Sequence, residues 1–133
     1  MDKKSGLEEL NKRREISLLM GGKDRVERHH QRGYLTARER IEKLLDPGTF
    51  TETGLFEQYD IPGSGGDKLP TSRIVGHGKI EGRRVVIHAD DRTVFAGSDA
   101  QKISGLPLRG PNLGGDKGLG YPIVILGDGG GGV

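Results

Sequence analysis

The sequence contains no cysteine and no tryptophan, and only 32% of its 133 residues are hydrophobic. Without cysteine the chain can form neither a disulfide nor a thiolate nucleophile. No apolar run reaches the roughly 18 residues of a membrane-spanning helix, and the first ten residues lack the apolar stretch of a secretion signal. We therefore expect a cytoplasmic protein that has a thin core and does not enter a membrane.

Excess charge of one sign is also missing, because the net charge is only +2. Residues 1–45 hold 12 Lys and Arg against 8 Asp and Glu, and the remainder holds 9 against 11. This segregation is too mild to indicate a nucleic-acid partner, and we expect none.

The histidines do not combine into a predicted metal site. His29 and His30 are neighbours, so on a helix their side chains point about 100° apart, and we assign both to a solvated helix face. His77 and His88 could lie opposite one another across a hairpin, yet two histidines do not complete a zinc site. We therefore expect no bound metal.

Two further patterns are explained more simply by structure than by chemistry. Asp90 and Asp91 are adjacent, and a strand directs neighbours to opposite faces, so turn or salt-bridge roles are favoured over an acid–base pair. Residues 63–68 superficially resemble a phosphate loop. They lack its G-x-x-x-x-G-K-[ST] spacing and a preceding buried strand, which argues against nucleotide binding there.

Helices are expected before residue 46. Residues 7–32 predict two short helices separated by Gly21-Gly22. Residues 36–39 (TARE) fit a capping box at the start of a third helix, and Asp46-Pro47-Gly48 ends that helix with turn chemistry. The apolar positions of this helix fall on one face: Ala37, Ile41, Leu44 and Leu45.

Strands are expected in the middle of the chain. Residues 73–80 and 83–89 are β-prone runs joined by Glu81-Gly82, which predicts a two-residue hairpin. A third run follows at 93–95. Before the hairpin, residues 49–59 predict a strand or extended arm, and residues 61–70 a loop.

The end of the sequence is rich in glycine. Residues 105–120 contain six glycines and two prolines, which predicts irregular structure. Residues 121–128 then read as a parallel strand buried on both faces, followed by Gly129–Gly132. Bare amides there could stabilise an oxyanion, although a flexible C-terminal tail explains the same residues. Because such a strand normally has parallel neighbours after it, the ending at Val133 has the character of an interruption.

Several blocks in their order resemble the start of the biotin-dependent acyl-CoA carboxyltransferases. The blocks are GYLTARERI (33–41), LLDPGTF (44–50) with Glu52, VGHGKIEGR (75–83), DRTVFAGS (91–98) and YPIVILGDGGGG (121–132). The family includes the β subunits of propionyl-CoA and acetyl-CoA carboxylases and the α subunits of methylmalonyl-CoA decarboxylases. The likeness covers nearly the whole chain, as the N-terminal portion of such a protein.

The resemblance implies an α/β fold, namely part of a crotonase-like (ClpP/crotonase) carboxyltransferase N-terminal domain with N-terminal helices and a β-hairpin. It implies a helical segment at 1–48 and an incomplete acyl-CoA-binding domain at 49–133. Family members pair two such domains, the first binding acyl-CoA and the second carboxybiotin, with the active site between subunits.

The site residues implied by the resemblance are backbone groups and a few contacts to the substrate. For the enolate they are the amides of Gly130, Gly131 and Gly132, and for acyl-CoA they are Gly97, Ser98 and Lys102. Each donor aimed at the enolate oxygen can lower the barrier by about 3 to 4 kcal/mol. The family pattern continues with Ala and Arg, and this sequence has Gly132 and Val133 instead.

The resemblance also implies partners. These are acyl-CoA, carboxybiotin on a carrier protein, biotin carrier and biotin carboxylase subunits, and either further copies of the chain or intact carboxyltransferase subunits. Two functions stay open: an acyl-CoA carboxyltransferase portion that is inactive alone, and a non-catalytic remnant or interaction module that binds such subunits through its N-terminal helices. A helix within residues 105–120 would favour the first.

Overall fold

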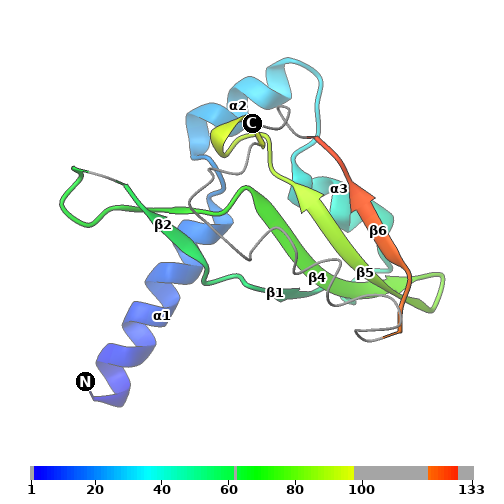
Figure 1. The fold of residues 1–133 in the computed structure, drawn as a ribbon, viewed down its shortest axis with the longest axis horizontal. Helices are drawn as coiled ribbons and strands as arrows, with labels where there is room; N and C mark the ends of the chain where they lie inside the picture. The colour runs from blue at the N-terminus through cyan, green and yellow to red at the C-terminus, as the bar shows by residue number, and fades with distance from the viewer. Residues whose placement is uncertain (1, 62, 98–119, 129–133) are drawn as a thin grey trace.

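The computed structural model describes residues 2–61, 63–97 and 120–128 of a mixed α/β fold. Its helices are α1 (Lys3–Leu18), α2 (Lys23–Gln31), α3 (Ala37–Leu44) and a short 3-10 helix η1 (Phe95–Gly97). Its strands are β1 (Thr51–Thr53), β2 (Gln58–Asp60), β3 (Lys68–Pro70), β4 (Arg73–Ile80), β5 (Arg83–Asp90) and β6 (Ile123–Leu126). One sheet has the order β1-β4-β5-β6, and β2 pairs with β3 separately (Figure 1).

The predicted hairpin is confirmed. Strands β4 and β5 pair antiparallel from Arg73 opposite Asp90 to Ile80 opposite Arg83, which leaves Glu81 and Gly82 as the loop. Both loop residues have positive φ, 49° and 77°, as the turn that matches strand twist requires. In this register His88 lies opposite Val75, so the possibility that His77 and His88 face each other is wrong.

The parallel strand near the end is also confirmed, but its burial on both faces is not found. Strand β6 runs parallel to β5, with Val86 opposite Ile123 and Ala89 opposite Leu126. Within the described residues it lies at the sheet edge, with Ile125 62% exposed. Because side chains alternate along a strand, Val124 and Leu126 pack on the core and Ile125 points away.

The core lies between helix α3 and one face of the sheet. The capping box that starts α3 is confirmed: the Thr36 hydroxyl accepts from the Glu39 amide at 3.3 Å, and the Thr36 amide donates to the Glu39 carboxylate at 2.9 Å. After the helix, the Asp46 carboxylate accepts from the amides of Glu81 and Gly82 and joins the helix end to the hairpin loop. The buried core residues are Ala37, Ile41, Leu45, Ile74, Val85, Ile87 and Ala89, with Leu44 partly buried against them.

The two helices before residue 32 are confirmed, with Gly21 and Gly22 between them. Helix α1 is not short, since it runs for 16 residues after Asp2, whose carboxylate accepts from the Ser5 amide. None of the helices in the described part of the chain is both long and apolar enough to span a bilayer.

Two strand predictions need correction. The run at 93–95 is not a strand, because the Asp91 carboxylate accepts from the amide and hydroxyl of Thr93 and bends the chain into a turn that leads to η1. Residues 61–70 are not entirely loop, since β3 pairs with β2 at their end. The arm at 49–59 divides into β1 and β2 around Gly54, which has φ of 84°.

Candidate functional site

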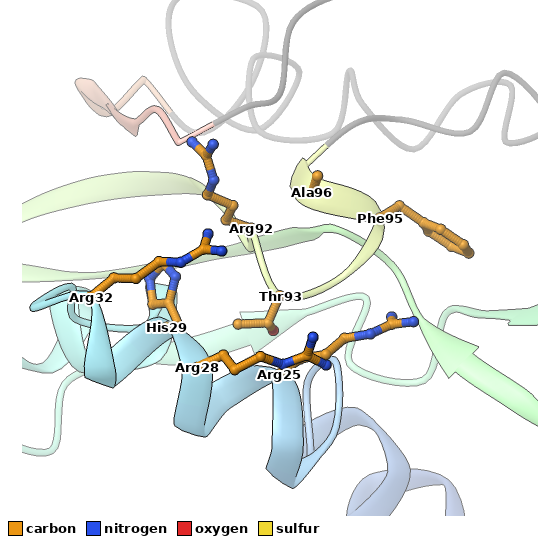
Figure 2. Close-up of a pocket in the computed structure, with 8 residues that line it drawn as sticks. All are labelled: Arg25, Arg28, His29, Arg32, Arg92, Thr93, Phe95 and Ala96. Atoms are coloured by element: carbon orange, nitrogen blue, oxygen red, sulfur yellow. The ribbon is translucent and has the colours of Figure 1, made fainter.

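A cavity of about 390 Å³ lies between helix α2 and the turn that follows β5. Figure 2 shows the helix side chains on one side of the hollow and those of the turn on the other. Its lining is strongly basic and consists of Arg25, Arg28, His29, Arg32, Arg92, Thr93, Phe95 and Ala96. We call this cavity the arginine pocket.

Helix α2 supplies three of the four guanidinium groups. Arg25, Arg28 and Arg32 are three and four residues apart in turn, which places them on one face of the helix. The Arg28 Nε donates to the Asp24 backbone carbonyl at 3.3 Å. Among residues 2–61, 63–97 and 120–128, no carboxylate lies within salt-bridge distance of these three side chains.

His29 forms the inner side of the pocket and is only 8% exposed. Its Nε2 lies 2.9 Å from the Leu35 carbonyl, and its ring packs 5.5 Å from that of Tyr34. The prediction that it belongs to a solvated helix face is therefore wrong, because the chain reverses after α2 and covers the ring. His30 does lie exposed, with its Nε2 2.8 Å from the Glu39 carboxylate.

The opposite wall is held in place by buried groups. Asp91 is 2% exposed, and burial raises the pKa of its carboxyl, against the opposing effect of the hydrogen bonds from Thr93. The Thr93 hydroxyl in turn accepts from the Gly21 amide at 3.0 Å. A Cβ on Gly21 would lie 1.9 Å from the Thr93 carbonyl oxygen, so only glycine allows this close approach.

The fourth guanidinium connects the pocket to the end of β6. Arg92 Nη1 lies 3.3 Å from Asp128 Oδ1, and the Asp128 amide donates to Asp90 Oδ2 at 3.1 Å. Asp90 also pairs with Arg73 at 3.0 Å. The turn or salt-bridge roles predicted for Asp90 and Asp91 are thus confirmed, because Asp90 forms an ion pair and Asp91 holds the turn. The hydrogen bond from Asp128 also joins the carboxyl ends of β5 and β6.

Of the site residues expected from the sequence, the structure describes Gly97. It is buried, ends η1 with φ of 74°, and directly follows Ala96 of the arginine pocket. The other expected residues, namely Ser98, Lys102, Gly130, Gly131 and Gly132, lie outside the described residues. The arginines of α2 were not among the predicted site residues, although their spacing of three and four residues indicates a single helix face.

A second cavity, of about 530 Å³, lies at the other end of the sheet and has a mixed lining. Its Arg84 already donates to the Tyr121 hydroxyl at 2.9 Å. In the described part of the chain, no three His, Asp or Glu side chains come together to hold a metal ion. Of the two cavities, the arginine pocket has the more strongly basic lining.

Comparison with known proteins places this geometry in context. Residues 28–131 match the carboxyl transferase domain. The mitochondrial propionyl-CoA carboxylase beta chain of Sus scrofa is 38% identical over 133 residues, covering 93% of this chain and 24% of the relative. The methylmalonyl-CoA decarboxylase subunit alpha of Propionigenium modestum is 36% identical over 128 residues, covering 94% and 24%.

Among solved structures, transcarboxylase 12S, a hexamer with hydrolysed methylmalonyl-CoA bound, superposes with a TM-score of 0.75 at 32% identity. The superposition covers 99% of this chain and 26% of that one. The chain thus spans about a quarter of the length of the relatives it matches. The match to the domain extends over most of these residues, and the chain belongs to the carboxyl transferase domain family.

Proposed function

We propose that this chain is the N-terminal portion of an acyl-CoA carboxyltransferase, which binds acyl-CoA and stabilises its enolate with the amides of Gly130, Gly131 and Gly132. The observation that carries this proposal is the parallel pairing of β6 with β5. The carboxyl ends of both strands lie at the same end of the sheet, on the side where α2 lies (Figure 1). Asp128, the residue that precedes the glycine run in the sequence, pairs with Arg92 of the arginine pocket.

The chemistry needs little from side chains. Removing a proton next to a thioester carbonyl puts negative charge on the carbonyl oxygen, and backbone amides aimed at that oxygen stabilise the charge without reorganisation. Glycines allow the backbone to approach the thioester closely. Carboxybiotin on a carrier protein would supply the carboxyl group and a base for the proton.

The finer fold is part of the same proposal. We assign residues 49–133 to an incomplete crotonase-like acyl-CoA-binding domain, preceded by the helical segment 1–48. The superposition on transcarboxylase 12S over nearly the whole chain supports this assignment. Gly97, Ser98 and Lys102 would then contact acyl-CoA.

Partners follow from the family. The related transcarboxylase 12S is a hexamer that has been solved with methylmalonyl-CoA bound, and the matched relatives are about four times as long as this chain. The chain would therefore act with further copies or with intact carboxyltransferase subunits, and with biotin carrier and biotin carboxylase subunits. By itself it would bind acyl-CoA without completing carboxyl transfer.

The test separates binding from turnover. Purified chain is mixed with propionyl-CoA or acetyl-CoA and carboxybiotin, and methylmalonyl-CoA or malonyl-CoA is measured against a control without protein. Binding of the same thioesters is measured by calorimetry. Binding without product is the expected result. Product above the control would show that the chain transfers carboxyl groups by itself, and absence of binding would contradict the acyl-CoA proposal.

The alternative, a non-catalytic remnant or interaction module, is favoured by one observation. Helix α1 and the residue after it expose several leucines, namely Leu7 (59%), Leu10 (40%), Leu18 (48%) and Leu19 (60%). A helix that leaves such side chains in water offers an apolar contact surface. Stable association with a carboxyltransferase subunit, in the absence of acyl-CoA binding, would favour this alternative.

A further inference from the structure

We propose that the second cavity is a phosphate site, which takes inorganic phosphate or the phosphate group of a small monoester. Its volume is about 530 Å³, and it lies at the hairpin end of β4 and β5, whereas α2 and the arginine pocket lie at the other end of the sheet (Figure 1). We call it the hairpin cavity. Its lining includes Thr49, His77, Lys79, Arg84 and Tyr121. The proposal does not depend on acyl-CoA binding.

The strand register brings two positive charges together in this cavity. Lys79 of β4 lies directly opposite Arg84 of β5. The Lys79 amide donates to the Thr49 hydroxyl at 3.1 Å, and the Lys79 carbonyl accepts from the Asp46 amide at 2.7 Å. Because its backbone bonds point away from β5, Lys79 forms a non-hydrogen-bonded pair with Arg84, the kind of pair in which opposed side chains are closest. Like charges in that position repel each other, and an anion bound between them removes the cost.

A third basic side chain comes from the same strand. His77 lies two residues before Lys79, so both side chains point to the same face of the sheet. In the parts of the chain that the structure describes, no carboxylate lies within salt-bridge distance of His77, Lys79 or Arg84. The Asp46 carboxylate accepts instead from the two amides of the hairpin loop. The positive charge of the cavity is therefore available to a ligand.

Arg84 is oriented before any ligand binds. Its Nη1 donates to the Tyr121 hydroxyl at 2.9 Å, and its guanidinium carbon lies 5.8 Å from the centre of the Tyr121 ring. A guanidinium has five N–H donors, so this single bond leaves most of them for an anion. A side chain that is already held in place loses less freedom when a ligand binds. Tyr121 precedes β6, so the cavity joins segments that are far apart in the sequence.

The set of donors favours phosphate over a simple carboxylate. A guanidinium binds two phosphate oxygens at once, and an ammonium group binds phosphate as a point charge. A phosphate monoester carries a charge of about −2, which matches the Lys79 and Arg84 pair better than a single carboxylate does. The volume of the cavity falls within the range of small-molecule sites, so the organic part of a small monoester also has room.

The experiment is an NMR titration of the isotope-labelled chain at fixed pH and constant ionic strength. The probes are inorganic phosphate and glycerol 2-phosphate, with acetate and chloride as controls. The ring signals of His77 and Tyr121 report on this cavity, and they are readily assigned because the chain has only four histidines and three tyrosines. We expect saturable shifts with both phosphates and none with the controls. The tighter of the two phosphates identifies the source of the ligand.

Paired substitutions locate the bound phosphate. Lys79→Gln combined with Arg84→Gln should weaken the affinity measured at His77 by about tenfold or more. The matched control is Arg25→Gln combined with Arg28→Gln, which removes the same charge from the arginine pocket. This control should leave the affinity measured at His77 within about twofold of wild type. Phosphate bound in the arginine pocket does not disturb the measurement, because the ring signals report on the hairpin cavity alone.

Thermal unfolding gives a second measurement. Without phosphate, Lys79→Gln should unfold at the same temperature as wild type or higher, because it removes the repulsion from Arg84. Phosphate should raise the unfolding temperature of wild type more than that of the Lys79 and Arg84 double variant. Equal affinities of the two double variants would overturn the proposal. So would His77 and Tyr121 shifts that chloride reproduces at the same ionic strength.

Discussion

Arg92 and Asp128 join the carboxyl ends of two parallel strands, with Arg92 Nη1 3.3 Å from Asp128 Oδ1. Arg92 follows β5 and also lines the arginine pocket, whereas Asp128 follows β6 and precedes the glycine run. This ion pair therefore connects a basic cavity to the segment proposed to carry the enolate-stabilising amides. Both residues are partly exposed, so the pair contributes little to stability.

Removing the capping box of α3 should lower the stability of the chain measurably. Thr36→Ala removes the hydroxyl that accepts from the Glu39 amide, and Thr36→Ser keeps it. The free energy of unfolding of Thr36→Ala should lie about 1 kcal/mol below that of Thr36→Ser in urea denaturation. Equal free energies of unfolding of the two variants would show that the Thr36 hydroxyl does not stabilise the helix.

Close approach of Gly21 to the turn after β5 predicts a position-specific effect. Gly21→Ala would place a Cβ 1.9 Å from the Thr93 carbonyl oxygen, so the backbone must move, at a cost of about 1 to 3 kcal/mol. Gly127→Ala is the control, since its Cβ would meet nothing within 4 Å. Thermal unfolding of both variants checks the prediction, and equal effects at the two positions would contradict it.

Because its carboxyl is buried, Asp91 should make the stability of the chain depend on pH. Burial raises the pKa of its carboxyl in the folded chain, so its favourable contribution is present below the ordinary aspartate value of about 3.9 and is lost as pH rises through the higher folded value. Asp91→Asn lacks this titration and keeps an oxygen that accepts from Thr93. The stability of wild type relative to Asp91→Asn should therefore fall from pH 4 upward in urea titrations. A relative rise would contradict the sign.

Because β6 lies at the edge of the described sheet, we expect the chain to self-associate. Ile125 is 62% exposed on a strand that has one described neighbour, and such an edge pairs readily with another chain. Ile125→Lys should lower the mean mass measured by size-exclusion chromatography with light scattering. Phe56→Lys, at a side chain 37% exposed away from β6, should leave the mass unchanged. A stable monomer of the unaltered chain would contradict this prediction.

Sequence reasoning was most successful where a few neighbouring residues determine the structure. The capping box at 36–39 and the Glu81-Gly82 loop depend on local hydrogen bonds and on positive φ, and both are found as predicted. The apolar face of α3 is likewise set by helical periodicity, and its members form the core.

The predictions failed where a particular side-chain contact, rather than residue propensity, decides the structure. The β-prone run at 93–95 becomes a turn because the buried Asp91 carboxylate binds Thr93, and propensity does not report that bond. His29 is buried because the chain after α2 folds back and brings the Leu35 carbonyl next to its ring. The arginine pocket requires α2 and Arg92 to meet in space, which the separate segments do not reveal.

The proposed function can be tested by NMR titration of the isotope-labelled chain with propionyl-CoA, with pantetheine as the control ligand. We expect saturable shifts of the amides of Gly130, Gly131 and Gly132. Pantetheine, which has no thioester carbonyl, should not reproduce these shifts. Saturating propionyl-CoA that leaves the glycine amides unchanged would contradict the proposal that this run stabilises the bound thioester.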